Sequence, residues 1–353
     1  MSQKNVLVLF GGHSPEHDVS LSSARTIVGA LSRHTVIPVY ITKAGKWLLY
    51  DGKLDNIQGI DWEKHGTPAI LSPDRVNRGL LRIVGDKVKT IPVDVAFPIL
   101  HGHNGEDGTI QGLCQLAGIP YVGCGVMASA VAMDKPVTRQ LARSLKIPVP
   151  DSLVFSREDV RDDLTETTKK IRYKIGYPCF VKPAVGGSSV GTAKVNNKKE
   201  LVPALTAALE ISSRVVVEKT IKGREIEVGI LGVGSEAKAS VPGEIKPDRE
   251  FYDYEAKYLS NTTEIIVPAE IDEETIKTIH KYALDIFSAI NGCGMARADF
   301  FLTEESRVVF NEINTIPGFT ANSIFPKMWE ASGVSCRDLV EGLLSLACEN
   351  ANG

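Results

Sequence analysis

The stretch KPAVGGSSVG, from Lys182 to Gly191, combines a lysine with two adjacent glycines and two adjacent serines. A loop of this composition exposes backbone N–H groups and hydroxyls that can surround phosphate oxygens, and the lysine adds a fixed positive charge. It is not a Walker A loop, because the GK[ST] ending is missing. The stretch therefore predicts a phosphate-binding loop, with an ordinary surface turn as the alternative.

Two short polar sets lie in ARADFFL and VVFNEIN, which both have the composition of strands. Arg297 and Asp299 are two residues apart, as are Glu312 and Asn314, so each pair projects from one face of its strand. Adjacent strands would gather two carboxylates, an amide and a guanidinium. Such oxygen ligands suit Mg²⁺ together with nucleotide phosphates. The alternative is a structural salt bridge of Arg297 with Asp299 or Glu312, but the phosphate loop favours the metal site.

Two further loops, GGHSPEHDVS (11–20) and HGHNGEDG (101–108), follow predicted strands. Open α/β sheets bind ligands at this edge, and Glu16 is suited to hold a substrate ammonium group. The histidines of these loops do not predict zinc, because neither an HExxH pattern nor a cysteine partner accompanies them. FYDYEAKY (251–258) is an aromatic-rich loop that predicts a lid over a ligand, or else a packed irregular edge.

The elements that must position these residues begin with alternating strand and helix patterns. Strands at 6–10, 35–42 and 93–100, with a helix at 20–31, predict a mostly parallel sheet covered by helices. Residues 108–133 are uncharged, but their glycines, proline and glutamines indicate buried helix, turn and short strand instead of a membrane span.

A helix from Asp134 to Leu145 begins with Asp134 as N-cap and Pro136 in its first turn, and a domain boundary is predicted near it. Downstream patterns predict a small α+β unit and then a second sheet with a helix. The predicted elements are a strand at 179–182, a helix at 199–211, strands at 215–218 and 224–230, a helix at 275–290 and a strand at 308–311.

The composition is that of an ordinary globular protein. The 353 residues suggest two or three domains, and 43% are hydrophobic and 24% charged. The formal net charge is −3 with no basic stripe, so nucleic acid is not an expected partner. Six scattered cysteines without a CxxC pair, and an N-terminus without a signal-peptide pattern, predict a reduced, cytoplasmic protein that does not associate with membranes.

Eight motifs in this order closely resemble the D-alanine–D-alanine ligase family of the ATP-grasp superfamily, over about residues 5 to 340: GGHSPEHDVS, HGHNGEDGT, MDKPVTR, KPAVGGSSVG, EKTIKGREIEV, FYDYEAKY, RADFF and NEINTIPGFTANS. The resemblance implies an α/β protein of three units with ATP between the last two. These are an N-terminal Rossmann-like parallel sheet (1–133), a small central α+β lid domain (134–220), and a C-terminal α+β domain (221–353) with a lid loop near 247–263.

The resemblance also implies an activity. Such ligases phosphorylate one D-alanine with ATP, and the amine of a second D-alanine then attacks the acyl phosphate, which gives D-alanyl-D-alanine, ADP and phosphate for peptidoglycan precursors. They act as homodimers. The residues that correspond to the family's ATP contacts are Lys135, Lys182, Ser188 and Ser189 at the phosphates, Glu218, Lys219 and Ile221 near adenine, and Glu225 at the ribose.

By the same resemblance, Asp299, Glu312 and Asn314 are expected to hold two Mg²⁺ or Mn²⁺ ions, with Glu312 between them. Arg297 and the backbone N–H of Gly318 are expected to stabilise the oxyanion.

The substrate residues follow in the same way. Glu16 is expected to hold the first ammonium group with His101 nearby, and Ser188 and Tyr258 would complete a hydrogen-bonded set with Glu16. The second-substrate pocket would use Lys257, Ser323 and Ile324.

Tyr258 favours the dipeptide product, since relatives that form D-alanyl-D-lactate usually have another residue there. Ile316 and Phe319, however, also occur among those relatives. Ligation of D-alanine to D-lactate or D-serine is therefore the first alternative, and a catalytically silent nucleotide-binding protein is the second.

Overall fold

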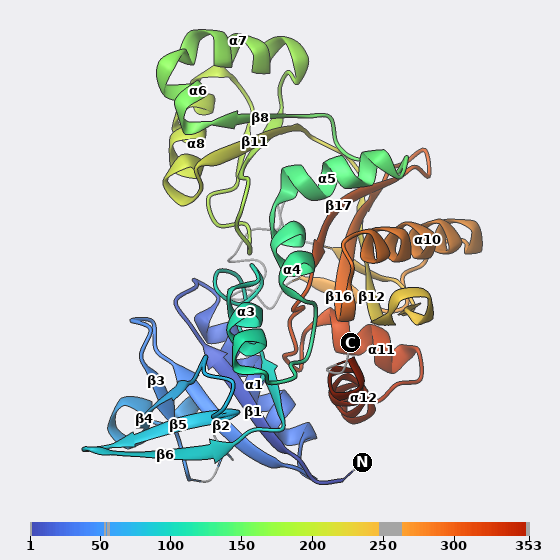
Figure 1. The fold of residues 1–353 in the computed structure, drawn as a ribbon. Helices are drawn as coiled ribbons and strands as arrows, with labels where there is room; N and C mark the ends of the chain where they lie inside the picture. Colours follow the sequence, from blue (N-terminus) through green and yellow to red (C-terminus); the bar gives the residue numbers. More distant parts are fainter. Residues whose placement is uncertain (1, 53, 55–56, 247–262, 351–353) are drawn as a thin grey trace.

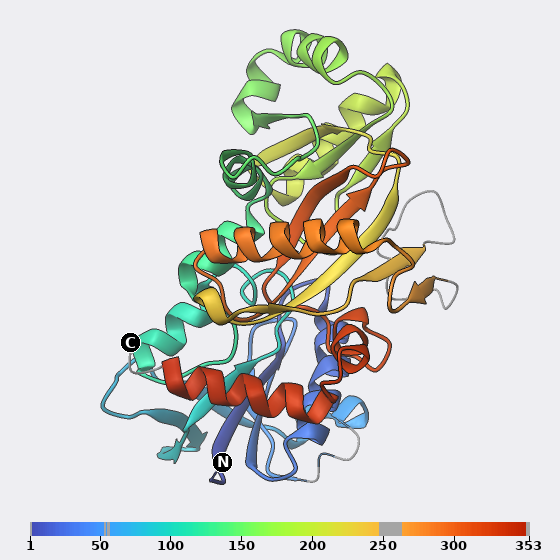
Figure 2. The ribbon, with the colours of Figure 1, turned by 90° about the vertical axis from the view of Figure 1, so that its right-hand side faces the viewer.

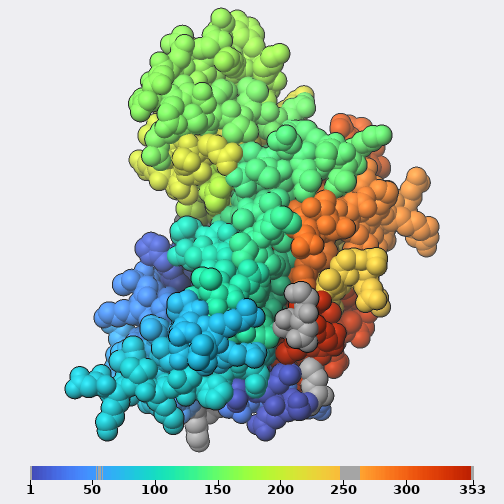
Figure 3. Space-filling view, in the orientation of Figure 1, coloured from blue at the N-terminus to red at the C-terminus, as the bar shows by residue number. Residues whose placement is uncertain are grey.

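The computed structural model describes residues 2–52, 54, 57–246 and 263–350. Within these residues the strands form three sheets, of seven, four and six strands. Figure 1 shows the N-terminal sheet at the bottom, the C-terminal sheet in the middle and the central sheet at the top. The space-filling view shows that the central unit projects from the rest of the molecule (Figure 3).

The N-terminal sheet has the strand order β6-β5-β4-β3-β2-β1-β7. Its strands are β1 Asn5–Gly11, β2 Thr35–Ile41, β3 Trp47–Leu49, β4 Thr67–Leu71, β5 Gly79–Val84, β6 Lys87–Pro92 and β7 Val95–Pro98. Because successive side chains of a strand point to opposite faces, Val6 and Val8 of β1 join one core cluster and Leu7 and Leu9 another.

The predicted parallel arrangement holds for β1, β2 and β7 only. Every other pairing in this sheet, from β2–β3 to β5–β6, is antiparallel, so the expectation of a mostly parallel sheet is wrong. The physical reason is the connections: β5 and β6 are joined by Gly85 and Asp86 alone, and a two-residue turn can only reverse the chain. The prediction placed no strand between residues 43 and 92.

Helices cover both faces of this sheet. α1 (His17–Ala30) and the C-terminal helix α12 (Cys336–Glu349) pack on the face that carries Val6 and Val8. α3 (Thr109–Ala117) packs on the opposite face. Figure 2 shows α12, in red, beside the N-terminal strands, so the end of the chain returns to its beginning. Two short elements, η1 (Ile57–Gly59) and α2 (Trp62–His65), complete this unit.

The central sheet is antiparallel with the order β10-β9-β11-β8. Its elements are β8 Ser152–Ser156, α6 Arg157–Asp162, α7 Leu164–Lys174, β9 Cys179–Pro183, β10 Ala193–Val195, α8 Lys198–Ile211 and β11 Arg214–Lys219. Ile171 of α7 and Leu205 of α8 pack against Val181 and Val217 of the sheet. The predicted strands and helix of this small α+β unit are confirmed within one residue at each end.

The C-terminal sheet has the order β15-β14-β12-β16-β17, and β13 pairs with β12. Its elements are β12 Arg224–Val233, η2 Gly234–Glu236, β13 Lys238–Ala239, β14 Gly243–Lys246, β15 Glu264–Ile266, α10 Glu273–Ala289, β16 Cys293–Leu302, β17 Val308–Asn314 and α11 Ile324–Ala331. The prediction that ARADFFL and VVFNEIN are adjacent strands is confirmed, and the structure shows them as the antiparallel pair β16 and β17. α10 lies across this sheet, with Ile279, Ala283 and Ile286 buried against it (Figure 2).

Two helices join the N-terminal unit to the other sheets. α4 (Val126–Met133) and α5 (Lys135–Ser144) run from the N-terminal sheet past the C-terminal sheet toward the central unit (Figure 1). α5 begins as predicted, because the Asp134 side chain accepts a hydrogen bond from the Val137 N–H at 3.1 Å. In the described residues, no helix is both long and apolar enough to span a membrane.

Candidate active site

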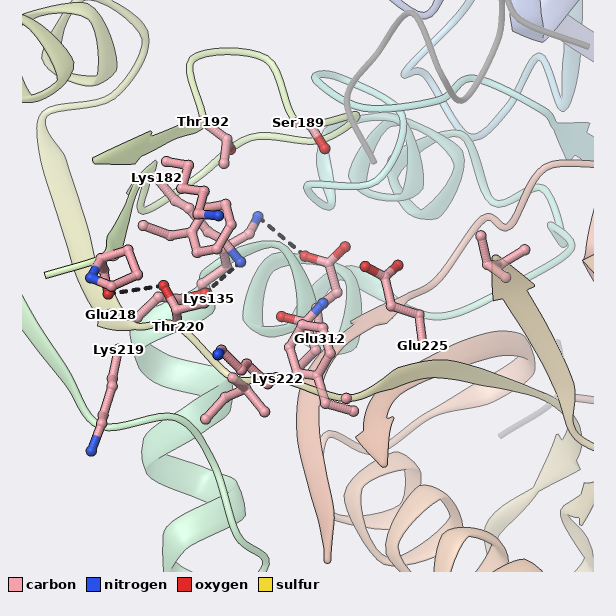
Figure 4. Close-up of a pocket in the computed structure, with 18 of the residues that line it drawn as sticks. Lys135, Lys182, Ser189, Thr192, Glu218, Lys219, Thr220, Lys222, Glu225 and Glu312 are labelled. Atoms are coloured by element: carbon pink, nitrogen blue, oxygen red, sulfur yellow. Dashed lines mark hydrogen bonds and ion pairs between the residues drawn. The ribbon is translucent and has the colours of Figure 1, made fainter. Parts of the chain in front are cut away.

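A cavity of about 980 Å³ lies between the central sheet and the C-terminal sheet. Strands β9, β11, β12 and β17 and the loop after β9 supply its lining (Figure 4). All eight residues predicted to contact ATP line it: Lys135, Lys182, Ser188, Ser189, Glu218, Lys219, Ile221 and Glu225. Lysines, hydroxyls and a loop of small residues around one cavity can bind a nucleotide with its phosphates.

A buried charge cluster stands on the central-sheet side of this cavity. Lys182 Nζ lies 2.6 Å from Glu218 Oε1, and Arg139 Nη1 donates to Glu218 Oε2. Burial by itself would raise the pKa of Glu218, but the cations of Arg139 and Lys182 lower that pKa to about 2. Glu218 is therefore ionised near neutral pH, and Lys182 is shared between this carboxylate and the cavity.

Sequence reasoning missed Arg139, although a signal was present. Arg139 follows Lys135 by four residues on α5, and residues four apart share one helix face. Its side chain is 1% exposed, and its guanidinium also donates to the backbone oxygen of Asn311 in β17 at 3.4 Å. The residue thus connects α5, the central sheet and the C-terminal sheet.

Lys135 connects the phosphate loop with the predicted metal ligands. Its Nζ donates to the Gly186 backbone oxygen at 2.6 Å and lies 3.5 Å from Glu312 Oε2 (Figure 4). Burial lowers the pKa of Lys135, and the Glu312 carboxylate opposes that shift. The ammonium group is placed where a phosphate held by the loop would meet it.

The predicted metal ligands face one another across β16 and β17, where Asp299 pairs with Glu312 and Arg297 with Asn314. Arg297 Nε and Nη2 donate to the two oxygens of Asp299, both at 2.8 Å, and Asn314 Nδ2 donates to Asp299 Oδ2 at 3.1 Å. The salt bridge offered as the alternative is thus present in the same cluster as the predicted ligands.

A further carboxylate, Glu227, was missed by the sequence reasoning. It lies opposite Asp299 on β12, and its Oε2 is 2.8 Å from Arg297 Nε. Its spacing from Glu225, two residues along one strand, could have indicated it. Burial would lower the pKa of Arg297, but Asp299 and Glu227 keep that pKa well above its ordinary value.

The donor set fits a divalent cation. Glu227, Asp299 and Glu312 bring three carboxylates to Arg297, so negative charge exceeds positive on this face. Among the described residues, no group of three or more His, Cys, Asp or Glu side chains could hold a metal ion, so a cation here would need ligands from outside the protein. Mg²⁺ commonly binds through one or two carboxylates plus nucleotide phosphates and waters, which agrees with such an arrangement.

The phosphate loop reaches the N-terminal unit at Glu16. Ser188 Oγ donates to Glu16 Oε1, which is the predicted contact between these residues. Ser188 and Ser189 have φ values of +49° and +59°, in the left-handed region, and a Cβ on Gly187 would lie 3.0 Å from Glu16 Oε2. The small residues of this loop therefore permit its close approach to Glu16. Tyr258, the third member of the predicted set, lies outside the described residues.

The remaining predicted residues surround the turn between β17 and α11. Ser323 precedes α11, and a Cβ on Gly318 would lie 2.9 Å from Ser323 Oγ, so these two residues are brought together. The Ile324 side chain is buried with Ile245 and Met328 in a small core. Lys257 lies outside the described residues.

His101 lies on the other side of this turn and is 4% exposed. Its Nδ1 is 3.1 Å from the Ile316 carbonyl oxygen, and its Nε2 is 3.0 Å from Ser23 Oγ. Glu106, which was not predicted, accepts hydrogen bonds from the N–H groups of Ile316 and Gly102. The loop 101–108 is therefore in contact with the segment that carries Gly318.

The three sheets, with a phosphate-loop cavity between the last two and carboxylates on its wall, define an ATP-grasp fold. Models of the D-ala D-ala ligase N-terminus and C-terminus match residues 5–124 and 141–345. Because these matches cover most of its length, the chain belongs to the D-alanine–D-alanine ligase family.

Individual relatives agree with this family assignment. D-alanine–D-alanine ligase of Acetivibrio thermocellus is 46% identical over 99% of this chain and 97% of its own, and that of Caldicellulosiruptor bescii is 44% identical over 99% and 96%. Among solved structures, the VanG D-Ala:D-Ser ligase from Enterococcus faecalis has a TM-score of 0.88 at 38% identity, covering 98% of this chain and 100% of that one. The Coxiella burnetii D-alanine–D-alanine ligase has a TM-score of 0.83 at 33% identity, covering 100% and 96%.

Proposed function

We propose that this protein joins two D-alanine molecules to D-alanyl-D-alanine with ATP, through a D-alanyl phosphate, for peptidoglycan precursor synthesis. The observation that carries the proposal is the arrangement of the nucleotide cavity, the carboxylate cluster and Glu16 around one phosphate loop. The family membership supports it over the full chain.

ATP would occupy the cavity of about 980 Å³ with its adenine near Glu218, Lys219 and Ile221 and its ribose at Glu225. The ionised Glu218 is suited to accept a hydrogen bond from an exocyclic amine. The phosphates would extend toward Lys135 and the loop of Ser188 and Ser189. Asp299, Glu312 and Asn314 would hold two Mg²⁺ or Mn²⁺ ions, which when bound neutralise phosphate charge.

In the first step, Glu16 would hold the ammonium group of the first D-alanine, whose carboxylate attacks the γ-phosphorus of ATP as ADP leaves. Lys135 would neutralise charge on the transferring group, because its ammonium lies between the loop and Glu312. The contact of Ser188 with Glu16 supports closure of the phosphate loop over this position, which would exclude water from the acyl phosphate.

In the second step, the neutral amine of the second D-alanine would attack the acyl carbonyl, and phosphate would leave. Arg297 and the N–H of Gly318 would stabilise the oxyanion. Lys257, Ser323 and Tyr258 would contact the second substrate or close the site, and Ile324 would contribute through its backbone, because its side chain is buried.

Ligation of D-alanine to D-serine is the second candidate. The observation that favours it is the likeness to the D-Ala:D-Ser ligase from Enterococcus faecalis, with its TM-score of 0.88. D-Lactate is the third candidate acceptor, because Ile316 and Phe319 also occur among depsipeptide-forming relatives.

The discriminating experiment supplies Mg-ATP with D-alanine alone, and then with D-serine or D-lactate added, at about pH 6 and about pH 9. ADP release is followed and products are identified by mass. We expect D-alanyl-D-alanine from D-alanine alone, with more product at the higher pH because the attacking amine must be unprotonated. ADP release only with D-serine or D-lactate would support the corresponding alternative, and no release under any condition would support a silent nucleotide-binding protein.

We also propose a cytoplasmic homodimer built of units 1–133, 134–220 and 221–353. The resemblance to the family supports the dimer and the division. Light scattering during size-exclusion chromatography measures the mass in solution, and a mass near that of one chain, 38.3 kDa, would contradict the dimer.

A further inference from the structure

The segment Ile316–Thr320 lies in the connection between β17, which ends at Asn314, and α11, which begins at Ile324, and it carries Gly318. Pro317 has no N–H, and three of the other four N–H groups donate to side chains. These bonds run from Ile316 to Glu106 Oε1 at 3.2 Å, from Phe319 to Ser23 Oγ at 3.2 Å and from Thr320 to Ser323 Oγ at 3.0 Å. Among the residues that the structure describes, none accepts a hydrogen bond from the Gly318 N–H, so it is the available donor of this segment.

Glu106 holds one side of the Ile316 peptide. Its Oε1 accepts from the Ile316 N–H, and its Oε2 accepts from the Gly102 N–H at 2.7 Å. Burial, with a smaller effect of the Glu16 charge, raises the pKa of Glu106 to about 8. A side-chain amide at this position would keep one acceptor oxygen, but its NH₂ group could not accept from the second N–H.

His101 holds the other side of the same residue. The carbonyl oxygen of Ile316 can only accept, so Nδ1 of His101 carries the proton and donates to it at 3.1 Å. Burial lowers the pKa of His101, which agrees with a neutral ring. Nε2 then accepts from the Ser23 hydroxyl at 3.0 Å, and Ser23 Oγ in turn accepts from the Phe319 N–H.

Together these hydrogen bonds connect the N-terminal unit with the residues on both sides of Gly318. Glu106 and His101 bind Ile316, and Ser23 binds Phe319. Ser23 is fully buried, and both ring nitrogens of His101 are engaged within the protein. We propose that Ser23, His101 and Glu106 are positioning residues that orient the free N–H of Gly318 toward the oxyanion. The inference rests on the proposed ligase function, and it assigns His101 to the backbone of the C-terminal unit instead of to the substrate.

We call Ser23, His101 and Glu106 the frame. It is needed because a segment that connects a strand to a helix has no regular backbone hydrogen bonds of its own to hold it in place. An oxyanion donor acts only when it is already in place, and removal of one such donor typically lowers kcat by about 10²- to 10³-fold. A displacement of about 1 Å can cost about 10²-fold. His101 and Glu106 lie in the loop whose Gly102 approaches Glu16, so the donor and the carboxylate that would hold the first substrate are positioned by the same loop.

The test compares Glu106→Ala, Glu106→Gln and Ser23→Ala with the controls Ser22→Ala and Glu63→Ala, which lie outside the frame. Steady-state kinetics give kcat and the KM for D-alanine, and calorimetry gives the Kd of a nonhydrolysable ATP analogue with Mg²⁺. We expect kcat to fall about 100-fold in Glu106→Ala and Ser23→Ala with little change in KM or in the Kd. Glu106→Gln should recover part of kcat, because its amide oxygen can accept from the Ile316 N–H, whereas its NH₂ group cannot accept from the Gly102 N–H.

A second measurement, amide hydrogen exchange of the peptide that spans 316–323, does not depend on turnover. Faster exchange in Glu106→Ala and Ser23→Ala, but not in either control, supports the frame even if a variant is inactive. Unchanged exchange, or a raised KM with unchanged kcat, would overturn the inference and return these residues to substrate binding. Failure of the ligase proposal is recognised separately, because the unsubstituted protein would then form no dipeptide.

Discussion

Arg139 and Lys182 share one buried carboxylate, Glu218, at the wall of the nucleotide cavity. Removing one partner of a buried ion pair is costly, because the other charge stays buried with less compensation. Arg139 in addition reaches Asn311 of the neighbouring sheet, so its loss affects both the charge of Glu218 and the junction between two sheets.

The substitution Arg139→Met should destabilise the fold by about 3–5 kcal/mol at pH 7. The pKa of Glu218 in the folded protein lies below its ordinary value of 4.5, so its ionisation stabilises the fold above about pH 4.5, and this contribution is lost as the pH falls toward about 2. The difference between variant and unsubstituted protein should therefore shrink below pH 4.5. Urea unfolding at pH 7 and at lower pH measures it, and a difference that grows with acidity would contradict the role of Arg139.

Glu312 faces Lys135 and Asp299 at the place proposed for the metal ions. Glu312→Gln keeps the volume and removes the charge, so we expect ADP formation to fall by on the order of 100-fold or more, with the fold retained. ADP release and circular dichroism measure the two effects. The exposed Glu305→Gln on the loop after β16 is the control, and near-normal turnover of Glu312→Gln would refute the metal assignment.

At the scale of elements, the loop between β7 and α3 is held by close backbone contacts. A Cβ on Gly105 would lie 1.9 Å from the Leu100 carbonyl oxygen, whereas a Cβ on Gly112, in the middle of α3, would meet only a methyl group of Val126 at 3.9 Å. The two positions therefore differ in whether they require glycine. Gly105 permits the loop to fold back on its strand, and Gly112 occupies a helix position that alanine would also fit.

We therefore expect Gly105→Ala to lower the free energy of unfolding by about 1–3 kcal/mol, because backbone must move to admit the methyl group. Gly112→Ala should instead raise it by about 0.5–1 kcal/mol, because alanine loses less conformational freedom in a helix. Denaturant unfolding of both variants is the measurement. Equal effects of the two substitutions would mean that the loop is not held by this contact.

At the scale of the whole molecule, the two ends of the chain share one core. Buried Leu339 and Leu343 of α12 pack in the same cluster as Val6 and Val8 of β1. The cluster also contains Phe319 of the segment that carries Gly318. The last helix therefore stabilises the first sheet and the site together.

Leu343→Ala should reduce the free energy of unfolding by about 2–5 kcal/mol, since it leaves a cavity in this shared core. Urea unfolding followed by tryptophan fluorescence gives the value, with the exposed Glu349→Ala in the same helix as the control. A loss below about 1 kcal/mol would show that α12 is not needed for the core.

The amino-acid sequence by itself determined the family, the order of the motifs and most of the elements. Spacing of two along strands was enough to predict that Arg297 and Asp299 share one face of a strand and Glu312 and Asn314 one face of its neighbour. The glycines and serines after Lys182 were enough to predict the phosphate loop. These features are local, because turn chemistry, capping and strand periodicity act within a few residues.

Only the tertiary structure decided which partners these residues have. The antiparallel strands β3–β6, the pairing of Arg139 with Glu218 and the contact of Glu227 with Arg297 depend on segments that are distant in the sequence. The same holds for His101, whose two ring nitrogens are engaged by Ser23 and Ile316. The physical reason is that burial and charge pairing arise when separate elements pack, and the energy of a buried polar group depends on neighbours that a single segment does not contain.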